Sequence, residues 1–271
     1  MKKSKVLSKI RSGKVARICC LGHFLPCFPR HAAHFGYDGI WIDGEHRAFD
    51  PREAQALIAF HHMAGIDCIW RPPTLEKTGL YRLLEDGASG LMIPHVSTPE
   101  KARMLVEAVR FPPLGDRGLD AAGLDADYMV NLKPSYSQDA NQETCLVVQI
   151  ETPQAMENLD AIAAVPGIDV IFLGPGDLSL RLGCSAATGD PQMMEVQKKI
   201  AAVAKKHGKA WGRPAFSQDD VKTLKDMGAQ FIVLGSEFWA IYSHIRDSSE
   251  RFDAALGEKT SLTSGLQVAV P

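Results

Sequence analysis

The stretch CLVVQIETPQAMENLDAIAAVPGIDVIFLGPGDLS, residues 145–179, decides the fold. It has apolar runs at 145–151 and 169–173, with an amphipathic segment at 153–164 between them. Runs that are apolar at nearly every position are typical of strands covered on both faces. The Thr152-Pro153 pair places a capping side chain before a proline at the first helical position. We therefore expect a strand, a helix and a second, parallel strand here.

The same pattern recurs along the whole chain. Strands are expected at 16–22, 39–43, 67–71, 90–94, 145–151, 169–173, 209–213 and 230–234. Helices are expected at 51–64, 76–87, 98–109, 153–164, 191–207 and 217–228. Eight strands alternating with helices predict a single (β/α)8 barrel. A doubly wound open sheet is the alternative, and it fits less well because no G-x-G-x-x-G motif follows the first strand.

Composition agrees with one large domain. The chain has 271 residues, of which 45% are hydrophobic and 23% charged, the ordinary mix of a globular protein with a full core. Residues 1–257 are expected to form the barrel. Residues 258–271 are small and polar without a helical period, so we expect a loosely ordered tail.

The net charge and hydropathy exclude several classes of partner. A net charge of -2 favours neither nucleic acid nor an anionic membrane. The basic start, MKKSKVLSKI, is not followed by an apolar run of signal-peptide length. No stretch approaches the roughly 20 apolar residues that span a bilayer. The expected location is the cytoplasm.

The six cysteines are scattered and form no C-x-x-C motif. Several lie in apolar, strand-like runs, so buried free thiols are expected rather than disulfides or a zinc site. One segment, 111–143, interrupts the strand–helix rhythm with several glycines and prolines and little periodicity. A connection of that length is usually functional or disordered, and we expect it to cover the barrel mouth or to meet a neighbouring subunit.

Ionisable side chains gather at the expected carboxyl ends of the strands, where barrels build their active sites. These positions are His23, Asp43 to His46, Arg71, His95, Gln149 to Glu151, and Gly174 to Asp177. Glu151 and Asp177 follow neighbouring strands, which lie about 4.8 Å apart, so both carboxylates can reach one hard cation such as Mg²⁺ or Mn²⁺. The simpler interpretation is that each only begins a helix.

Two further motifs belong to the predicted site. Gly174-Pro175-Gly176 lets the backbone approach an anion at a helix start, although it is also an ordinary turn. Asp43 stands three residues before His46 and is expected to orient its imidazole for proton transfer; a solvated histidine is the alternative. An iron-binding triad of Asp43, Glu45 and His46 fits less well, because neighbouring side chains alternate in direction.

Arg71 closes a strand and could hold a carboxylate or stabilise an enolate oxygen, unless it is only a structural ion pair. No lysine stands at an expected carboxyl end, which argues against a Schiff-base aldolase. His31, His34, His61 and His62 fall on helical stretches and are expected at the surface or an interface. His23 and His95 could line the pocket, but nothing in the sequence gives them a role.

These segments resemble the HpcH/HpaI aldolases, class II metal-dependent pyruvate aldolases of the phosphoenolpyruvate/pyruvate barrel superfamily. The resemblance covers residues 5 to 255, and WIDGEH, QIET and GPGDLS, in this order, are its specific motifs. It is carried by GYDGIWIDGEHRAFD (36–50), CIWRPP (68–73), GLMIPHVSTPEKARMLVEAVRFPPLGDRG (90–118), residues 146–179 and GAQFIVLGSE (228–237).

The resemblance implies a role for each matching residue. Glu151 and Asp177 would be the ligands of a divalent ion (Mg²⁺, Mn²⁺ or Co²⁺), with Gln149 lining the site. His46, oriented by Asp43, would be the general base, and Arg71 would contact the pyruvate oxygens. Backbone N–H groups of Gly176 and Asp177, in the Gly174–Asp177 turn with Pro175, would bind the pyruvate carboxylate; many relatives have alanine at position 176. Glu85 stands where the family has an aspartate that assists the base across a subunit contact, so the resemblance implies that role for a glutamate here.

The reaction implied is the cleavage or formation of a 4-hydroxy-2-oxo acid, giving pyruvate or a close 2-oxo acid and an aldehyde. The resemblance also implies a homo-oligomer, a hexamer built as a trimer of dimers, in which the C-terminal helix at 237–256 is exchanged between subunits. The acidic 111–143 segment favours a hydroxylated aldehyde over one with a second carboxylate. The alternatives are a malyl or citramalyl thioester lyase, an oxaloacetate decarboxylase and, more remotely, an inactive binding barrel.

Overall fold

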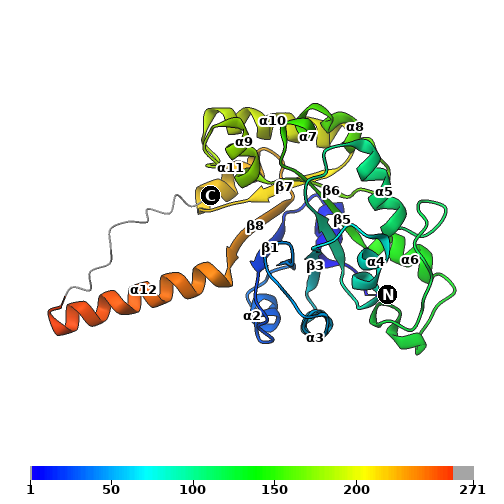
Figure 1. Ribbon diagram of the computed structural model, residues 1–271, viewed down its shortest axis with the longest axis horizontal. Helices are drawn as coiled ribbons and strands as arrows, with labels where there is room; N and C mark the ends of the chain where they lie inside the picture. Colours follow the sequence, from blue (N-terminus) through cyan, green and yellow to red (C-terminus); the bar gives the residue numbers. More distant parts are fainter. Residues whose placement is uncertain (1, 259–271) are drawn as a thin grey trace.

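The computed structural model describes residues 2–258. Its centre is a closed barrel of eight strands, each parallel to both neighbours, in the order of the sequence (Figure 1). The strands are β1 (Ala16–Leu21), β2 (Gly39–Asp43), β3 (Asp67–Arg71), β4 (Gly90–Ile93), β5 (Cys145–Ile150), β6 (Val170–Leu173), β7 (Ala210–Pro214) and β8 (Phe231–Ser236). The predicted (β/α)8 barrel is confirmed, and every strand lies within two residues of its expected bounds.

Helices surround the barrel. They are α1 (Lys5–Arg11), α2 (Phe28–His34), α3 (Pro51–Ala64), α4 (Lys77–Glu85), α5 (Pro99–Val109), η1 (Leu124–Met129), α6 (Tyr136–Glu143), α7 (Pro153–Glu157), α8 (Leu159–Ala163), α9 (Pro175–Leu182), α10 (Pro191–Lys206), α11 (Gln218–Asp226) and α12 (Glu237–Leu256). Thr152 caps α7 through its side chain, as predicted. The helix expected at 153–164 is instead two short helices that meet at Asn158.

Two apolar layers hold the barrel together. Its interior is filled by side chains such as Ile18, Met92 and Phe172, all fully buried. A larger layer fills the space between the strands and the surrounding helices. Val6 and Leu7 of α1 belong to the interior cluster, so this helix closes the amino-terminal end of the barrel. The carboxyl ends of the strands stay accessible for a site.

The segment 111–143, expected to cover the barrel mouth or to meet a neighbouring subunit, is not irregular throughout. It contains η1 and α6, and it has a small core of its own formed by Phe111, Ala126, Tyr136 and Ala140. Arg110, just before it, donates to the carbonyls of Thr144 and Gly167, which precede β5 and β6. The chain just before the segment is thus anchored at the amino ends of these strands, while Asp116 within it pairs with Lys77 at the start of α4.

Two other expectations need correction. His61 is buried rather than at the surface, with its Nδ1 2.7 Å from the Leu57 carbonyl oxygen; burial lowers its pKa to about 4. All six cysteines are free, as predicted, but Cys27 is exposed while Cys19, Cys68 and Cys145 are buried. The tail expected at 258–271 lies outside the described residues, apart from Glu258.

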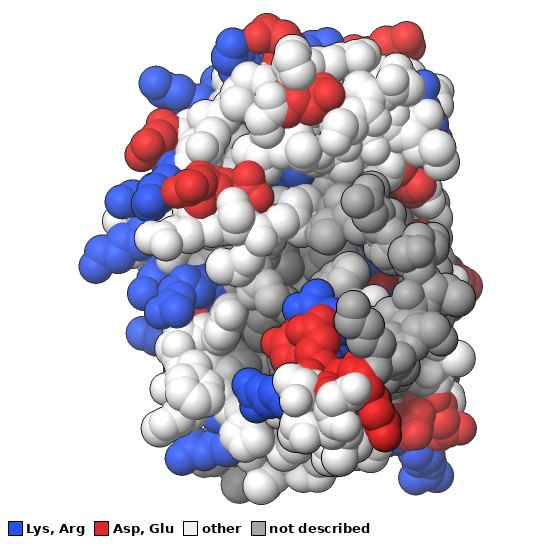
Figure 2. Space-filling model, turned by 90° about the vertical axis from the view of Figure 1, so that its left-hand side faces the viewer, with Lys and Arg blue, Asp and Glu red and all other residues white. Residues whose placement is uncertain are grey.

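Helix α12 extends away from the barrel (Figure 1). Its exposed apolar side chains are Phe238, Trp239, Ile241, Tyr242, Ile245, Phe252 and Leu256. Within residues 2–258, no helix has the length and apolar character to cross a bilayer. On the face drawn in Figure 2, basic side chains follow one edge and acidic side chains stand in separate groups. Charges of both signs therefore share this face.

Candidate metal centre and active site

Glu151 and Asp177 come together at the mouth of the barrel. Glu151 directly follows β5, and Asp177 lies in the first turn of α9, which follows β6. Because β5 and β6 are paired, both carboxylates lie at the same edge. One ligand atom each from His95, Glu151 and Asp177 lies within 4.8 Å of the others. The two acids predicted from the sequence are therefore brought to one place, with a histidine beside them.

His95 is the functional candidate to which the sequence gave no role. It follows β4 by two residues and has a φ of 53°, in the left-handed region that non-glycine residues rarely adopt. Its Nδ1 lies 3.2 Å from Glu151 Oε1, and its Nε2 lies 3.8 Å from Asp177 Oδ2. Lys101 donates to the carbonyl of His95 and so holds this loop. The only feature of the sequence that pointed to His95 was its position, two residues after the end of a strand.

The Glu151 carboxylate is held from two sides. Its Oε1 accepts the backbone N–H of His95 at 2.6 Å, and its Oε2 accepts Nε2 of Gln149 at 3.0 Å. Burial raises the pKa of Glu151, and the neighbouring charges of Asp177 and Glu45 raise it further, while His95 opposes them. Crowded, partly buried carboxylates gain most from a bound cation, which offsets their repulsion.

The residues present fit a divalent cation. Carboxylate oxygens are the ligands that Mg²⁺ prefers, and an imidazole nitrogen also suits Mn²⁺ or Co²⁺. Space is reserved for them, because a Cβ added at Gly174 would lie 2.2 Å from Glu151 Oε2. At Gly176, by contrast, an added Cβ would meet nothing within 4 Å. Glycine at 174 is needed to seat the carboxylate, whereas alanine would fit at 176.

Arg71 links the acid pair to the end of β2. Its guanidinium contacts Asp43 at 2.8 Å and Glu45 at 2.9 Å, and it donates to Gln149 Oε1 at 3.3 Å. The side chain is 7% exposed and lies over the Trp41 ring. Burial alone would raise the pKa of Asp43, but Arg71 and the His46 N–H outweigh it and lower that pKa. Arg71 is thus both an ion-pair partner and a positive charge at the mouth.

The geometry around His46 differs from the expectation. Asp43 Oδ1 accepts the backbone N–H of His46 at 3.1 Å, so it positions the loop rather than the ring. The imidazole Nε2 instead lies 3.6 Å from Glu45 Oε2, and the side chain is 58% exposed. The three-residue spacing between Asp43 and His46 is compatible with a hydrogen bond to the backbone or to the ring. The sequence alone could therefore not show that Asp43 bonds the backbone N–H.

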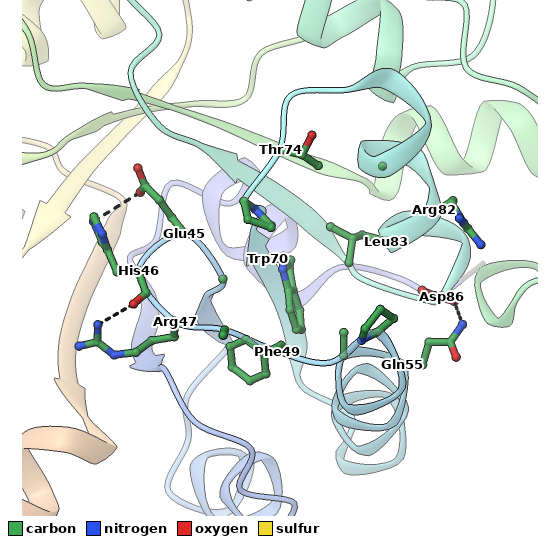
Figure 3. A pocket seen from close by; sticks show the side chains of 16 residues that line it. Glu45, His46, Arg47, Phe49, Gln55, Trp70, Thr74, Arg82, Leu83 and Asp86 are labelled. Atoms are coloured by element: carbon green, nitrogen blue, oxygen red, sulfur yellow. Dashed lines mark hydrogen bonds and ion pairs between the residues drawn. The ribbon is translucent and has the colours of Figure 1, made fainter.

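A cavity of about 770 Å³ borders this site. Figure 3 shows Trp70 and Phe49 at its centre, with Glu45 and His46 on one side and the hydrogen-bonded pair Gln55 and Asp86 on the other. Neither Glu151 nor Asp177 lines it. The cavity therefore adjoins the candidate metal centre through the β2 loop but does not contain it.

Glu85 does not join the other predicted residues. It lies at the end of α4 and lines a separate depression with Tyr81, Gly118 and Asp120. Burial raises its pKa, although the nearby Arg117 opposes this. Glu85 and His46 thus line different cavities.

A closed barrel with these carboxylates at its mouth has the architecture of a barrel lyase. Residues 23–242 match the model of the HpcH/HpaI aldolase/citrate lyase family, and the chain belongs to that family. It is thus an aldolase, a carbon–carbon lyase, as the sequence predicted.

Similar proteins agree with this assignment. The hydroxypyruvate/pyruvate aldolase of Roseovarius nubinhibens is 34% identical over 228 residues, covering 84% of this chain and 88% of that protein. The 2-keto-3-deoxy-L-rhamnonate aldolase of Salmonella typhi is 36% identical over 222 residues, covering 80% of each. The crystal structure of an HpcH/HpaI aldolase from Desulfitobacterium hafniense superposes with a TM-score of 0.83 at 29% identity, covering 91% of this chain and 95% of that one.

Proposed function

We propose that this chain is a class II aldolase that cleaves or forms a 4-hydroxy-2-oxo acid, giving pyruvate or a close 2-oxo acid and an aldehyde. The observation that carries the proposal is the grouping of Glu151, Asp177 and His95 beside the buried Arg71. An enolate needs positive charge where its oxygen develops, and this group of residues offers two means of supplying it.

Glu151 and Asp177 would hold the divalent ion, and His95 is a third candidate ligand. When bound, such an ion (Mg²⁺, Mn²⁺ or Co²⁺) would stabilise the negative charge of the enolate. The backbone N–H groups of Gly176 and Asp177, in the first turn of α9 after Gly174 and Pro175, would receive the substrate carboxylate. Arg71 would face the keto oxygen. Gln149 would fix the positions of Arg71 and Glu151, since it accepts a hydrogen bond from the first and donates one to the second.

His46 would move the proton. In cleavage it removes the proton of the C4 hydroxyl, the C3–C4 bond breaks, and the electron pair passes to the enolate while the aldehyde leaves. The enolate then takes a proton at C3 to become the 2-oxo acid. Asp43 acts by holding the backbone of the His46 loop, and its pairing with Arg71 keeps the loop close to the substrate.

The assembly proposed from the sequence is a hexamer, a trimer of dimers in which α12 is exchanged. Its support is the row of exposed apolar side chains on α12, since patches of that kind usually mark an interface. In such an assembly Glu85 would assist a base in a neighbouring subunit. A barrel over 1–257 and a cytoplasmic location stay predictions.

The test combines pyruvate with a panel of aldehydes, using enzyme stripped by a chelator and then reloaded with Mg²⁺, Mn²⁺ or Co²⁺. Aldol product is expected only after reloading. His46→Ala should slow cleavage far more than it weakens pyruvate binding. Product from the stripped enzyme would refute the metal centre, and oxaloacetate decarboxylation or thioester cleavage without any aldol product would favour the alternatives.

A further inference from the structure

A second polar pair lies at the mouth, where β1 and β8 end. Glu237, the first residue of α12, is 4% exposed, and its Oε1 lies 2.7 Å from Nδ1 of His23. The same oxygen accepts the backbone N–H of Gly22 at 2.7 Å. A buried carboxylate is costly unless its lone pairs are used, and here a ring nitrogen and a backbone amide use them.

This contact determines which nitrogen of His23 carries the proton. Glu237 Oε1 already acts as an acceptor toward Gly22, so Nδ1 of His23 is the donor in the pair. In the neutral ring Nε2 is then left with a free lone pair. Half of the side chain is exposed, and within residues 2–258 no hydrogen-bond partner of Nε2 is found. In its neutral form the ring therefore presents an unused acceptor.

The pair adjoins the catalytic loop. A Cβ added at Gly22 would lie 3.1 Å from Cγ of Arg47, and the Arg47 guanidinium donates to the His46 carbonyl at 2.8 Å. Burial raises the pKa of the Cys20 thiol, and the charges of Asp43 and Glu237 raise it further. Both carboxylates therefore lie near Cys20, at the end of β1. His23 and Glu237 thus belong to the same end of the barrel as His46.

The position suits the aldehyde rather than the 2-oxo acid. The 2-oxo acid is assigned above to the ends of β5 and β6, and in a closed barrel of eight strands β1 lies opposite β5. The outer part of the aldehyde would extend past His46 toward β1. An aldehyde with its own carboxylate would meet the negative charges of Glu237 and Asp43, whereas a hydroxyl group offers a donor to Nε2.

We propose that His23, held by Glu237, is a specificity-determining residue that accepts a hydrogen bond from a hydroxyl group beside the carbonyl of the aldehyde. The inference rests on the proposed aldolase function and names its second substrate by class. One such hydrogen bond is worth up to about 1.5 kcal/mol, which corresponds to roughly tenfold in kcat/KM.

Glycolaldehyde and propanal give a matched test, because they differ only by a hydroxyl in place of a methyl group. With pyruvate as donor, the wild-type enzyme is expected to prefer glycolaldehyde in kcat/KM. His23→Leu should lower that preference by about tenfold. His23→Gln, which keeps a polar atom near the position of Nε2, should recover part of it. His34→Leu, on the exposed face of α2, is the control and should change nothing.

Proton exchange at C3 of pyruvate in D₂O separates this inference from the proposed function, since that step needs no aldehyde. A wild-type enzyme without exchange would refute the aldolase proposal, and the role of His23 with it. Exchange together with an unchanged preference in His23→Leu would overturn the role of His23 alone. Equal loss of exchange and preference in that variant would also overturn it, because the residue would then be structural.

Glu237 acts through His23 and is a positioning residue. ¹⁵N-histidine-labelled enzyme, with His23→Gln identifying the His23 signal, should show Nδ1 protonated and Nε2 unprotonated in the wild type. Glu237→Gln should abolish this tautomer preference and reduce the preference for glycolaldehyde while His23 remains. A wild-type ring protonated at Nε2, whether or not Nδ1 is also protonated, would contradict the proposal.

Discussion

The position of the Glu151 carboxylate depends on Gly174, which has no side chain. A Cβ at position 174 would lie 2.2 Å from Glu151 Oε2, a distance that forces the carboxylate to move. Gly174→Ala should therefore weaken Mn²⁺ binding at least tenfold, by roughly 1.4 kcal/mol, with the barrel still folded. Mn²⁺ titration followed by electron paramagnetic resonance measures this directly.

Gly176→Ala is the matched control, since nothing lies within 4 Å of its added Cβ. It should bind Mn²⁺ as the wild type does. Equal weakening in both variants would mean that general disturbance of the turn, and not displacement of Glu151, is responsible.

His61 makes stability depend on pH. Burial lowers its folded-state pKa to about 4, from 6.5, so between those values the unfolded chain binds more protons. The free energy of unfolding should thus fall as pH drops from 6.5 toward 4, by up to about 3 kcal/mol for this group. Urea unfolding across that range should show a shallower pH slope in His61→Leu than in the wild type. Equal slopes would contradict the assignment; His34→Leu, exposed on α2, should leave the slope unchanged.

At the scale of elements, α1 closes the barrel through a buried acid. Asp67 Oδ2 accepts the Ser4 hydroxyl at 2.6 Å and the Val6 N–H at 2.9 Å, and Ser4 Oγ also caps the helix at Leu7. Ser4→Ala removes two of these contacts and should cost about 2 kcal/mol in urea unfolding. Ser12→Ala, at the exposed end of α1, should cost little. A loss in Ser4→Ala no larger than in Ser12→Ala would refute the role of the cap.

The sequence predicted the strands well because most of them are apolar on both faces, so a simple run of apolar residues carries the signal. It did not predict η1 and α6, because that segment is held by a small core of four residues and by polar contacts, and has no periodic apolar face. Arg117 pairs with Asp125 at 2.8 Å, and the Tyr136 hydroxyl donates to the same carboxylate. A contact between side chains 11 residues apart produces no periodic pattern of apolar residues in the sequence.

The sequence could predict those residues of the candidate site that lie directly at the ends of strands. Glu151, Asp177 and Arg71 were placed by position alone, since the carboxyl ends of all eight strands meet at one mouth. The contacts of His46 and the role of His95 depend on loop conformation, including the left-handed backbone at His95. Loop backbone of that kind has no signature in a single sequence.

At the scale of the whole molecule, α12 carries the case for assembly. Ile241 and Ile245 are one turn apart and both exposed. Replacing both with aspartate should reduce the mass measured by analytical ultracentrifugation from that of a hexamer to that of a smaller species, because charges are costly in an apolar interface. Glu250→Gln, on the same helix, should leave the mass unchanged. A double variant with the wild-type mass would show that this face of α12 is not an interface.

The proposed chemistry depends most on a cation, held by Glu151 and Asp177, that stabilises an enolate. Exchange of the pyruvate methyl protons for deuterium, followed by ¹H NMR, observes that enolate without any aldehyde. Exchange is expected in metal-loaded enzyme, absent after chelation, restored by Mn²⁺, and absent in Asp177→Asn. Exchange at the wild-type rate in the chelated enzyme or in Asp177→Asn would contradict the account.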